Sequence, residues 1–112
     1  MTRDEVGAAA FALPATTKVV QWGGSDVYKV GGKVFAICGL GGGLSFKVSE
    51  IGFMALTEDG PARQAPYLAK GHWVVVDHDD IDRDAGGSWL ASSHGLIAAK
   101  LTRKLRTELG LI

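Results

Sequence analysis

Apolar and polar residues change their period along the chain, and this change divides it into helices and strands. The small apolar run over residues 6–13 follows Thr2 and Glu5, which have the spacing of a helix capping box, and it ends at Pro14. We therefore predict a buried helix that stops before this proline. Its acidic first turn argues against a secretory signal, and the run is too short to span a bilayer.

The middle of the chain has the pattern of a meander of short antiparallel strands. Gly31 and Gly32 separate two β-prone runs, residues 27–30 and 33–38, and such a two-glycine turn predicts a hairpin. In residues 44–48 apolar and polar side chains alternate, so one face of this strand is apolar and the other is polar. We expect one face of the sheet to meet water.

Two more helices and one strand are predicted after the meander. Ser49 can cap a helix that should end near Thr57, and a turn-rich connector leads from there to a strand over residues 72–76. A long helix should follow over residues 80–109. Its apolar stripe consists of Leu90, Ile97, Leu101 and Leu105. Helices before, within and after a sheet predict one α+β domain, residues 1–112, as a two-layer sandwich with the helices on one face of an antiparallel sheet.

Composition agrees with an ordinary folded domain. Of the 112 residues, 46% are hydrophobic and 21% are charged, and the formal net charge is zero. A neutral chain argues against tight, nonspecific binding of nucleic acid. The lone Cys38 excludes an internal disulfide and fits a reducing compartment, so we expect a cytoplasmic protein. We also expect no membrane segment, and a monomer or a weak dimer.

Charge is unevenly distributed along the second half of the chain. Residues 77–84 contain five aspartates and one arginine, whereas residues 100–108 contain four cations and one glutamate. Carboxylates favour the first turn of a helix and cations favour the last turn. We interpret both segments as helix-end chemistry.

Motifs for nucleotide or metal binding are incomplete. The glycine cluster at residues 39–43 lacks a following Gly-Lys-Ser/Thr and leads into a strand, whereas phosphate-binding loops open a helix. Three alternate aspartates, residues 80, 82 and 84, resemble the start of a calcium loop, but Ala85 occupies the place of its required glycine. The histidines lack the spacing of metal ligands. We therefore expect no cofactor and no metal.

Catalytic residues are not apparent either. Ser93 and His94 are neighbours in the predicted last helix, where their side chains point about 100° apart and make a poor dyad. Ser93 is better explained as a polar residue at a helix packing site. We expect no enzymatic activity.

Several short motifs occur in an order that resembles the MmcQ/YjbR family of small bacterial proteins. They are Trp22-Gly23, the Gly31-Gly32 hairpin, Leu44 to Val48, Tyr67 to Trp73, and a last helix with Ser93, Leu96 and Arg103-Lys104. The resemblance implies a frataxin-like (CyaY-like) α+β sandwich whose hairpins are likened to the paired wings of winged DNA-binding domains. His94 departs from the family, which often has tyrosine there.

The remaining candidates for a binding site are basic and aromatic residues of the sheet and its turns. They are Lys29, Lys33, Lys47, Arg63, Tyr67, Lys70, His72 and Trp73. Cations neutralise phosphates and exposed rings stack on bases, so we predict a noncatalytic module that binds DNA weakly and in a salt-sensitive way. The alternative is a protein-interaction or scaffold domain whose protein partner binds the exposed sheet face or the acidic turn at residues 77–84.

Two geometric questions stay open at this point. Across the predicted hairpin, Lys33 pairs with Val30 and Lys29 with Val34, so the two lysines face opposite sides of the sheet. Tyr67 could pack in the core or be exposed, and the same alternatives hold for Trp73.

Overall fold

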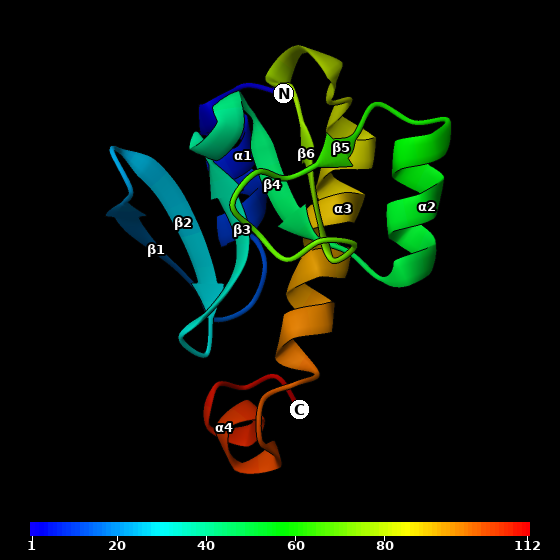
Figure 1. Cartoon of the computed structure of the whole chain (residues 1–112). Helices are drawn as coiled ribbons and strands as arrows, with labels where there is room; N and C mark the ends of the chain where they lie inside the picture. The colour runs from blue at the N-terminus through cyan, green and yellow to red at the C-terminus, as the bar shows by residue number, and fades with distance from the viewer.

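The structure, a computed structural model, describes residues 1–112 and has helices on one face of a six-stranded antiparallel sheet (Figure 1). The helices are α1 (Arg3–Phe11), α2 (Glu50–Glu58), α3 (Arg83–Ala98) and α4 (Arg103–Glu108), with short 3-10 helices η1 (Leu40–Gly42) and η2 (His78–Asp80). The strands are β1 (Thr16–Gln21), β2 (Ser25–Val30), β3 (Lys33–Cys38), β4 (Leu44–Lys47), β5 (Arg63–Gln64) and β6 (Trp73–Val76), in the order β1-β2-β3-β4-β6-β5. The predicted fold class is confirmed.

Helix starts follow the predicted caps. Thr2 accepts a hydrogen bond from the backbone N–H of Glu5, whose side chain accepts one from Thr2 in return, so the capping box is complete. Ser49 caps α2 by accepting from Gly52. Both side chains satisfy backbone donors that a helix end leaves without an intrahelical partner.

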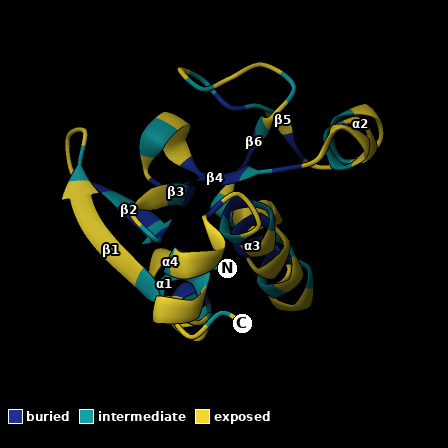
Figure 2. Cartoon of the chain, turned by 90° about the horizontal axis from the view of Figure 1, so that it is seen from below, coloured by how far each residue is buried: buried dark blue, intermediate teal, exposed yellow.

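One face of the sheet packs against α1 and α3 and forms the main core. The strand register puts Tyr28, Ala36, Phe46 and Val74 in one row across four strands, and all four are buried. Figure 2 shows α1 and α3 together on this side of the sheet. We call it the helix face.

The opposite face, which we call the far face, is covered as well, and here our expectation of a face that meets water is wrong. Its central row, Val27, Ile37, Ser45 and Val75, is 0% exposed. The 3-10 helix η1 and the connector over residues 65–72 lie over this face (Figure 2). The Ser45 hydroxyl donates to the carbonyl oxygen of Leu40 in η1, 3.4 Å away. Because η1 and the connector have no regular hydrophobic period, no sequence pattern indicates that they cover the sheet. The alternation of apolar and polar residues in the strands therefore suggested an open face.

The predicted long C-terminal helix is also wrong, because it is divided into α3 and α4. The Thr102 hydroxyl accepts from the backbone N–H of Leu105 and starts α4 as a new helix. Before it, Leu101 is buried against the β2–β3 turn, where a Cβ on Gly31 would lie only 2.6 Å from Leu101 Cδ1. Leu90, Ile97 and Leu101 of the predicted apolar stripe are buried in the core, and Leu105 is partly buried against it after the chain turns into α4. The two-residue strand β5 was not predicted.

Candidate nucleic-acid interface

The turn between β2 and β3 and the junction between α3 and α4 lie together at one end of the molecule (Figure 1). The contact between Gly31 and Leu101 joins them. This end carries six cations, which we call the basic end: Lys29, Lys33, Lys47, Lys100, Arg103 and Lys104. Segments that are about 70 residues apart in the sequence thus supply one concentration of positive charge.

Lys47 links the sheet to the C-terminal part of this end. Burial lowers the pKa of the Lys47 ammonium, and repulsion from the nearby Lys100 lowers it further. Only the second effect involves another cation, and it shows that the Lys100 charge lies close enough to act on Lys47. An anion bound beside the two lysines would relieve this repulsion.

Carboxylates gather at the other end of α3. The acidic residues 77–84 surround the start of this helix, while Lys100 follows its end. A helix of 16 residues is about 24 Å long, so the two charge groups are well separated. The molecule therefore has no net charge but has a strong separation of positive and negative charge.

The ion pairs use none of the cations of the basic end. Arg3 pairs with Asp26 at 2.7 Å, Arg63 pairs with Asp77 at 3.2 Å, and Arg83 pairs with Glu5. The three arginines thus neutralise carboxylates elsewhere. The six cations of the basic end keep their charge available for a ligand.

Our interpretation of the C-terminal cations as helix-end chemistry is wrong for two of them, Arg103 and Lys104, whereas Lys100 directly follows the C-cap of α3. The last turn of α3 contains no basic residue, and Arg103 and Lys104 stand in the first turn of α4. Cations at a helix start are unfavourable to the helix dipole. Stabilisation of a helix end therefore does not account for Arg103 or Lys104. Because all the C-terminal cations were interpreted as helix-end residues, sequence reasoning did not include Lys100, Arg103 and Lys104 among the site residues.

The register divides the lysines of the β2–β3 hairpin as predicted. Lys29 pairs with Val34, and Val30 pairs with Lys33. Because Val30 belongs to the helix-face core, Lys29 points to the far face and Lys33 extends from the turn on the other side. The two lysines can therefore contact the same ligand only if that ligand extends around the turn from one side of the sheet to the other.

Lys47 and Trp73 are paired neighbours on β4 and β6. Each lies two residues from a member of the central row of the far face, so both side chains belong to that face. Trp73 is half-buried and is not part of the main core. The far face thus combines one ring and two cations, counting Lys29, near the basic end.

The connector over residues 65–72 holds the other predicted residues. The Gln64 side-chain amide donates to the carbonyl oxygens of Ala65 (2.8 Å) and Leu68 (3.3 Å), and its oxygen accepts from the N–H of Gly71 (3.0 Å). These bonds fix a loop on which Tyr67, Lys70 and His72 are all exposed. Sequence reasoning did not identify Gln64 as the residue that organises this loop.

Arg63 is the predicted site residue that the structure places elsewhere. Its guanidinium donates to Asp77 Oδ1 and, at 3.5 Å, to the carbonyl oxygen of Gly41. Both partners hold it toward the acidic end. We therefore remove Arg63 from the candidate interface.

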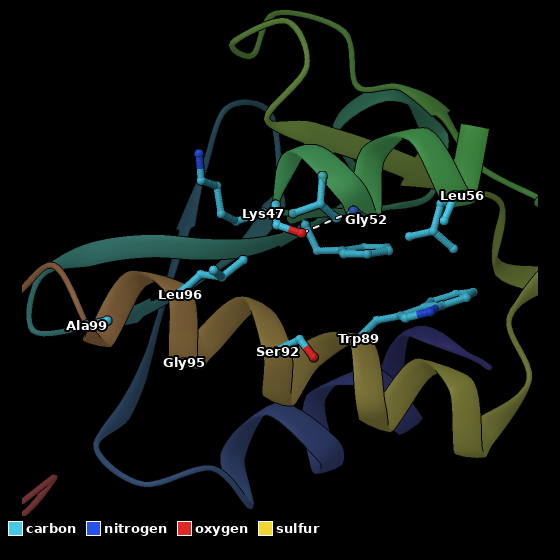
Figure 3. Close-up of a pocket in the computed structure, with 12 residues that line it drawn as sticks. Lys47, Gly52, Leu56, Trp89, Ser92, Gly95, Leu96 and Ala99 are labelled. Atoms are coloured by element: carbon cyan, nitrogen blue, oxygen red, sulfur yellow. Dashed lines mark hydrogen bonds between the residues drawn. The ribbon is translucent and has the colours of Figure 1, made fainter. Parts of the chain in front are cut away.

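An apolar groove of about 630 Å³ runs between α2 and α3 (Figure 3). Phe46 forms its floor and stacks on Trp89, with ring centroids 5.3 Å apart and an interplanar angle of 12°. Lys47 borders the groove, but its side chain points away from α3 in Figure 3. The groove therefore offers apolar contact without a charged group directed into it.

The side chains that could act as nucleophiles or bases, Ser93, His94 and Cys38, are used in packing instead. The Ser93 hydroxyl donates to the carbonyl oxygen of Lys47 at 2.6 Å, as expected for a polar residue at a helix packing site. His94 Nε2 lies 2.7 Å from the carbonyl oxygen of Pro14, and its ring meets Phe35 edge to face. Burial raises the pKa of the Cys38 thiol to about 12, which disfavours the reactive thiolate.

Candidate metal ligands are dispersed: no three His, Cys, Asp or Glu side chains form a group that could hold a metal ion. Among the helices, none has the length and apolar character that a membrane span requires.

Comparisons with known proteins place the chain in a structural family. The YjbR family model matches residues 11–96. The crystal structure of the Deinococcus radiodurans protein DR2400, which has a DUF419 domain, is similar with a TM-score of 0.86 and 26% sequence identity. The match covers 97% of this chain and 88% of that one. A search of curated proteins gives no match.

Proposed function

We propose that this chain, which belongs to the YjbR family, is a noncatalytic binding module that holds nucleic acid, in particular DNA, by its phosphates at the basic end. One observation carries the proposal. Six cations from distant parts of the chain gather at one end of a neutral molecule without an ion-pair partner, while the acidic cluster of residues 77–84 lies at the other end of α3.

Phosphate contacts match this arrangement better than recognition of one small anion. The cations stand on a hairpin, a strand and a helix junction and are not focused on one point. A polyanion with regularly spaced charges can contact such a spread surface, and its counterions are released when it binds. The acidic end turns away from the same polyanion, so the dipole orients the molecule during approach.

Binding should be weak and largely independent of sequence. The basic end presents no helix of the length that reads a major groove, because α4 contains Arg103, Lys104 and Arg106 but has only six residues, and α3 contributes its buried residues to the core. Contacts of lysines to phosphates position a protein on DNA but carry no base information. We expect a nonspecific dissociation constant of roughly 10⁻⁴ to 10⁻⁶ M.

The competing proposal, a protein-interaction domain, loses part of its basis in this geometry. The sheet face that it required is covered at its centre by η1 and the connector. The acidic residues 77–84 remain mostly exposed, but nothing in their arrangement indicates a particular partner.

A titration of labelled duplex DNA at several salt concentrations tests the proposal. The Lys33→Ala/Lys100→Ala variant should bind more weakly, and its slope of log affinity against log salt should be shallower by about two, since each phosphate contact contributes about 0.9. The Arg63→Ala/Arg83→Ala variant is the matched control, because it removes the same charge from residues that pair with carboxylates.

The outcomes are distinct. A reduced slope in the lysine variant but not in the arginine control supports phosphate binding at the basic end. Equal effects of both variants would mean that only net charge matters. No detectable binding by the parent at low salt would refute the function itself.

A further inference from the structure

The far face carries a hollow of about 390 Å³ that is lined by Trp22, Leu40, Tyr67 and Leu68. We call it the aromatic hollow. Its walls come from three separate segments: the β1–β2 turn, η1 and the connector. No part of the chain fills it, and both of its aromatic side chains are exposed, Trp22 to 54% and Tyr67 to 89%.

The backbone at these two rings is unusual. Only three residues other than glycine have a positive φ, and two of them are Trp22 (49°) and Tyr67 (67°). Bulky side chains disfavour this conformation, and strained positions of this kind concentrate where a structure binds ligands. The two strained residues line the same hollow although they are 45 positions apart in the chain.

One free cation accompanies the rings on the same side of the sheet. Lys70 follows Tyr67 in the connector that Gln64 fixes, and it forms no ion pair. Lys29 and Lys47 also point to the far face, but each lies at the end of its strand away from the hollow, toward the basic end. Exposed rings with a free cation in the same loop match a ligand with flat apolar groups on a chain of negative charges, since rings stack on bases while cations hold phosphates.

We infer that the aromatic hollow binds unpaired bases of single-stranded nucleic acid, which stack on Trp22 and Tyr67 while Lys70 contacts the adjoining phosphate. The inference rests on the proposed function and makes it more specific, because bases within a duplex are stacked on each other and cannot enter the hollow. It predicts a preference for single strands.

The test compares three labelled probes: an oligothymidylate of about 15 nucleotides, an abasic oligonucleotide of the same length, and a duplex of that length. The parent should bind the oligothymidylate more tightly than the abasic probe. The Trp22→Leu/Tyr67→Leu variant should lose about tenfold in affinity for the oligothymidylate. Its affinity for the abasic probe and for the duplex should be unchanged, because the phosphate contacts remain.

The matched control is Phe11→Leu, which removes another exposed ring, 52% accessible, from the end of α1 on the other side of the sheet. It should bind all three probes as the parent does. Thermal melting of the Trp22→Leu/Tyr67→Leu variant should resemble that of the parent, since both rings are exposed. Phe11→Leu also loses an edge-to-face contact with Tyr28, so its binding is measured well below its own melting transition.

Failure of the inference and failure of the proposed function give different results. Equal binding of the oligothymidylate and the abasic probe by the parent would overturn base stacking and leave phosphate binding intact. Binding of no probe at low salt would overturn both. Unchanged affinity in the double variant, with loss of a dimer in sedimentation, would assign the hollow to a second copy of this chain.

Discussion

The two faces of the sheet are buried to a similar degree but are covered in different ways. On the helix face, α1 and α3 pack against the strands in a cluster of 17 buried residues. On the far face, the cover consists of η1 and a connector whose shape depends on the hydrogen bonds of one glutamine. Regular elements hold the first face by apolar contact, and polar bonds hold the cover of the second.

The helix face therefore provides most of the apolar core that stabilises the fold, whereas the far face carries part of the candidate binding surface. A helix layer opens only at a large cost in free energy, because many apolar contacts are lost together. A loop cover can open locally while the sheet stays intact. The exposed ring of Tyr67 and the free cation Lys70 belong to the second kind of region, where binding loops are usually found.

The largest effect is expected on the helix face. Leu90→Ala removes a fully buried side chain of α3 and should lower the free energy of unfolding by about 2 to 5 kcal/mol, measured by urea denaturation. Ile51→Ala is the control, because Ile51 is 81% exposed on α2 and should change stability by less than about 0.5 kcal/mol. Similar values for both variants would refute the assignment of the core.

A somewhat smaller loss should follow from Ile37→Ala on the far face. Ile37 is 0% exposed, so the cost should be about 2 to 4 kcal/mol in the same urea experiment. An open face, as the strand pattern suggested, would give a cost near that of Ile51→Ala. The result therefore decides whether the loop cover seals the sheet in solution.

Gln64→Ala tests the polar part of this cover. Loss of three hydrogen bonds at a half-buried side chain should destabilise the protein by about 1 to 2 kcal/mol. Hydrogen exchange should accelerate at residues 65–72 but not in α3. Gln21→Ala, at a glutamine without side-chain hydrogen bonds, is the control, and a uniform acceleration in the Gln64 variant would contradict a locally held connector.

The smallest effect concerns the ion pair that joins α1 to the β1–β2 turn. The hydrogen bond from Arg3 lowers the pKa of Asp26, so the ionised carboxylate stabilises the folded state above pH about 4. This contribution should be lost as the pH falls through the lowered pKa of the folded state.

Asp26→Asn should remove that part of the acid destabilisation, measured as the free energy of unfolding between pH 2 and about 6. Arg3→Ala should have the same effect, and the double variant should add little, because the two residues act as a pair. Independent, additive effects would show that the pair does not act as a unit.

The features that were predictable from sequence are those that local patterns encode. Capping by Thr2 and Ser49 depends on residues three positions apart, and the pairing of Lys29 with Val34 follows from a two-residue turn. The helix-face core follows from strand alternation and the stripe of α3. In each case the physical cause lies within a few residues of its effect.

What was missed depends on contacts between distant segments. The hydrophobic periodicity of the sequence does not predict that Gln64 holds the connector over the far face, or that Leu101 contacts the hairpin turn at Gly31. The basic end was not predicted either, because it is formed by segments that are distant in the sequence. Lys100 was visible as a charge, but its approach to Lys47 exists only in three dimensions.

The separation of charge along α3 also governs how molecules of this protein behave toward one another. With a formal charge of zero and an isoelectric point near 6.8, no net repulsion keeps them apart at neutral pH. The acidic end of one molecule then attracts the basic end of the next, and this attraction reaches further as the Debye length grows. We expect solutions to turn cloudy in dilute buffer near pH 7 and to clear when salt is added, with a polyanion acting as a more efficient clearing agent than simple salt.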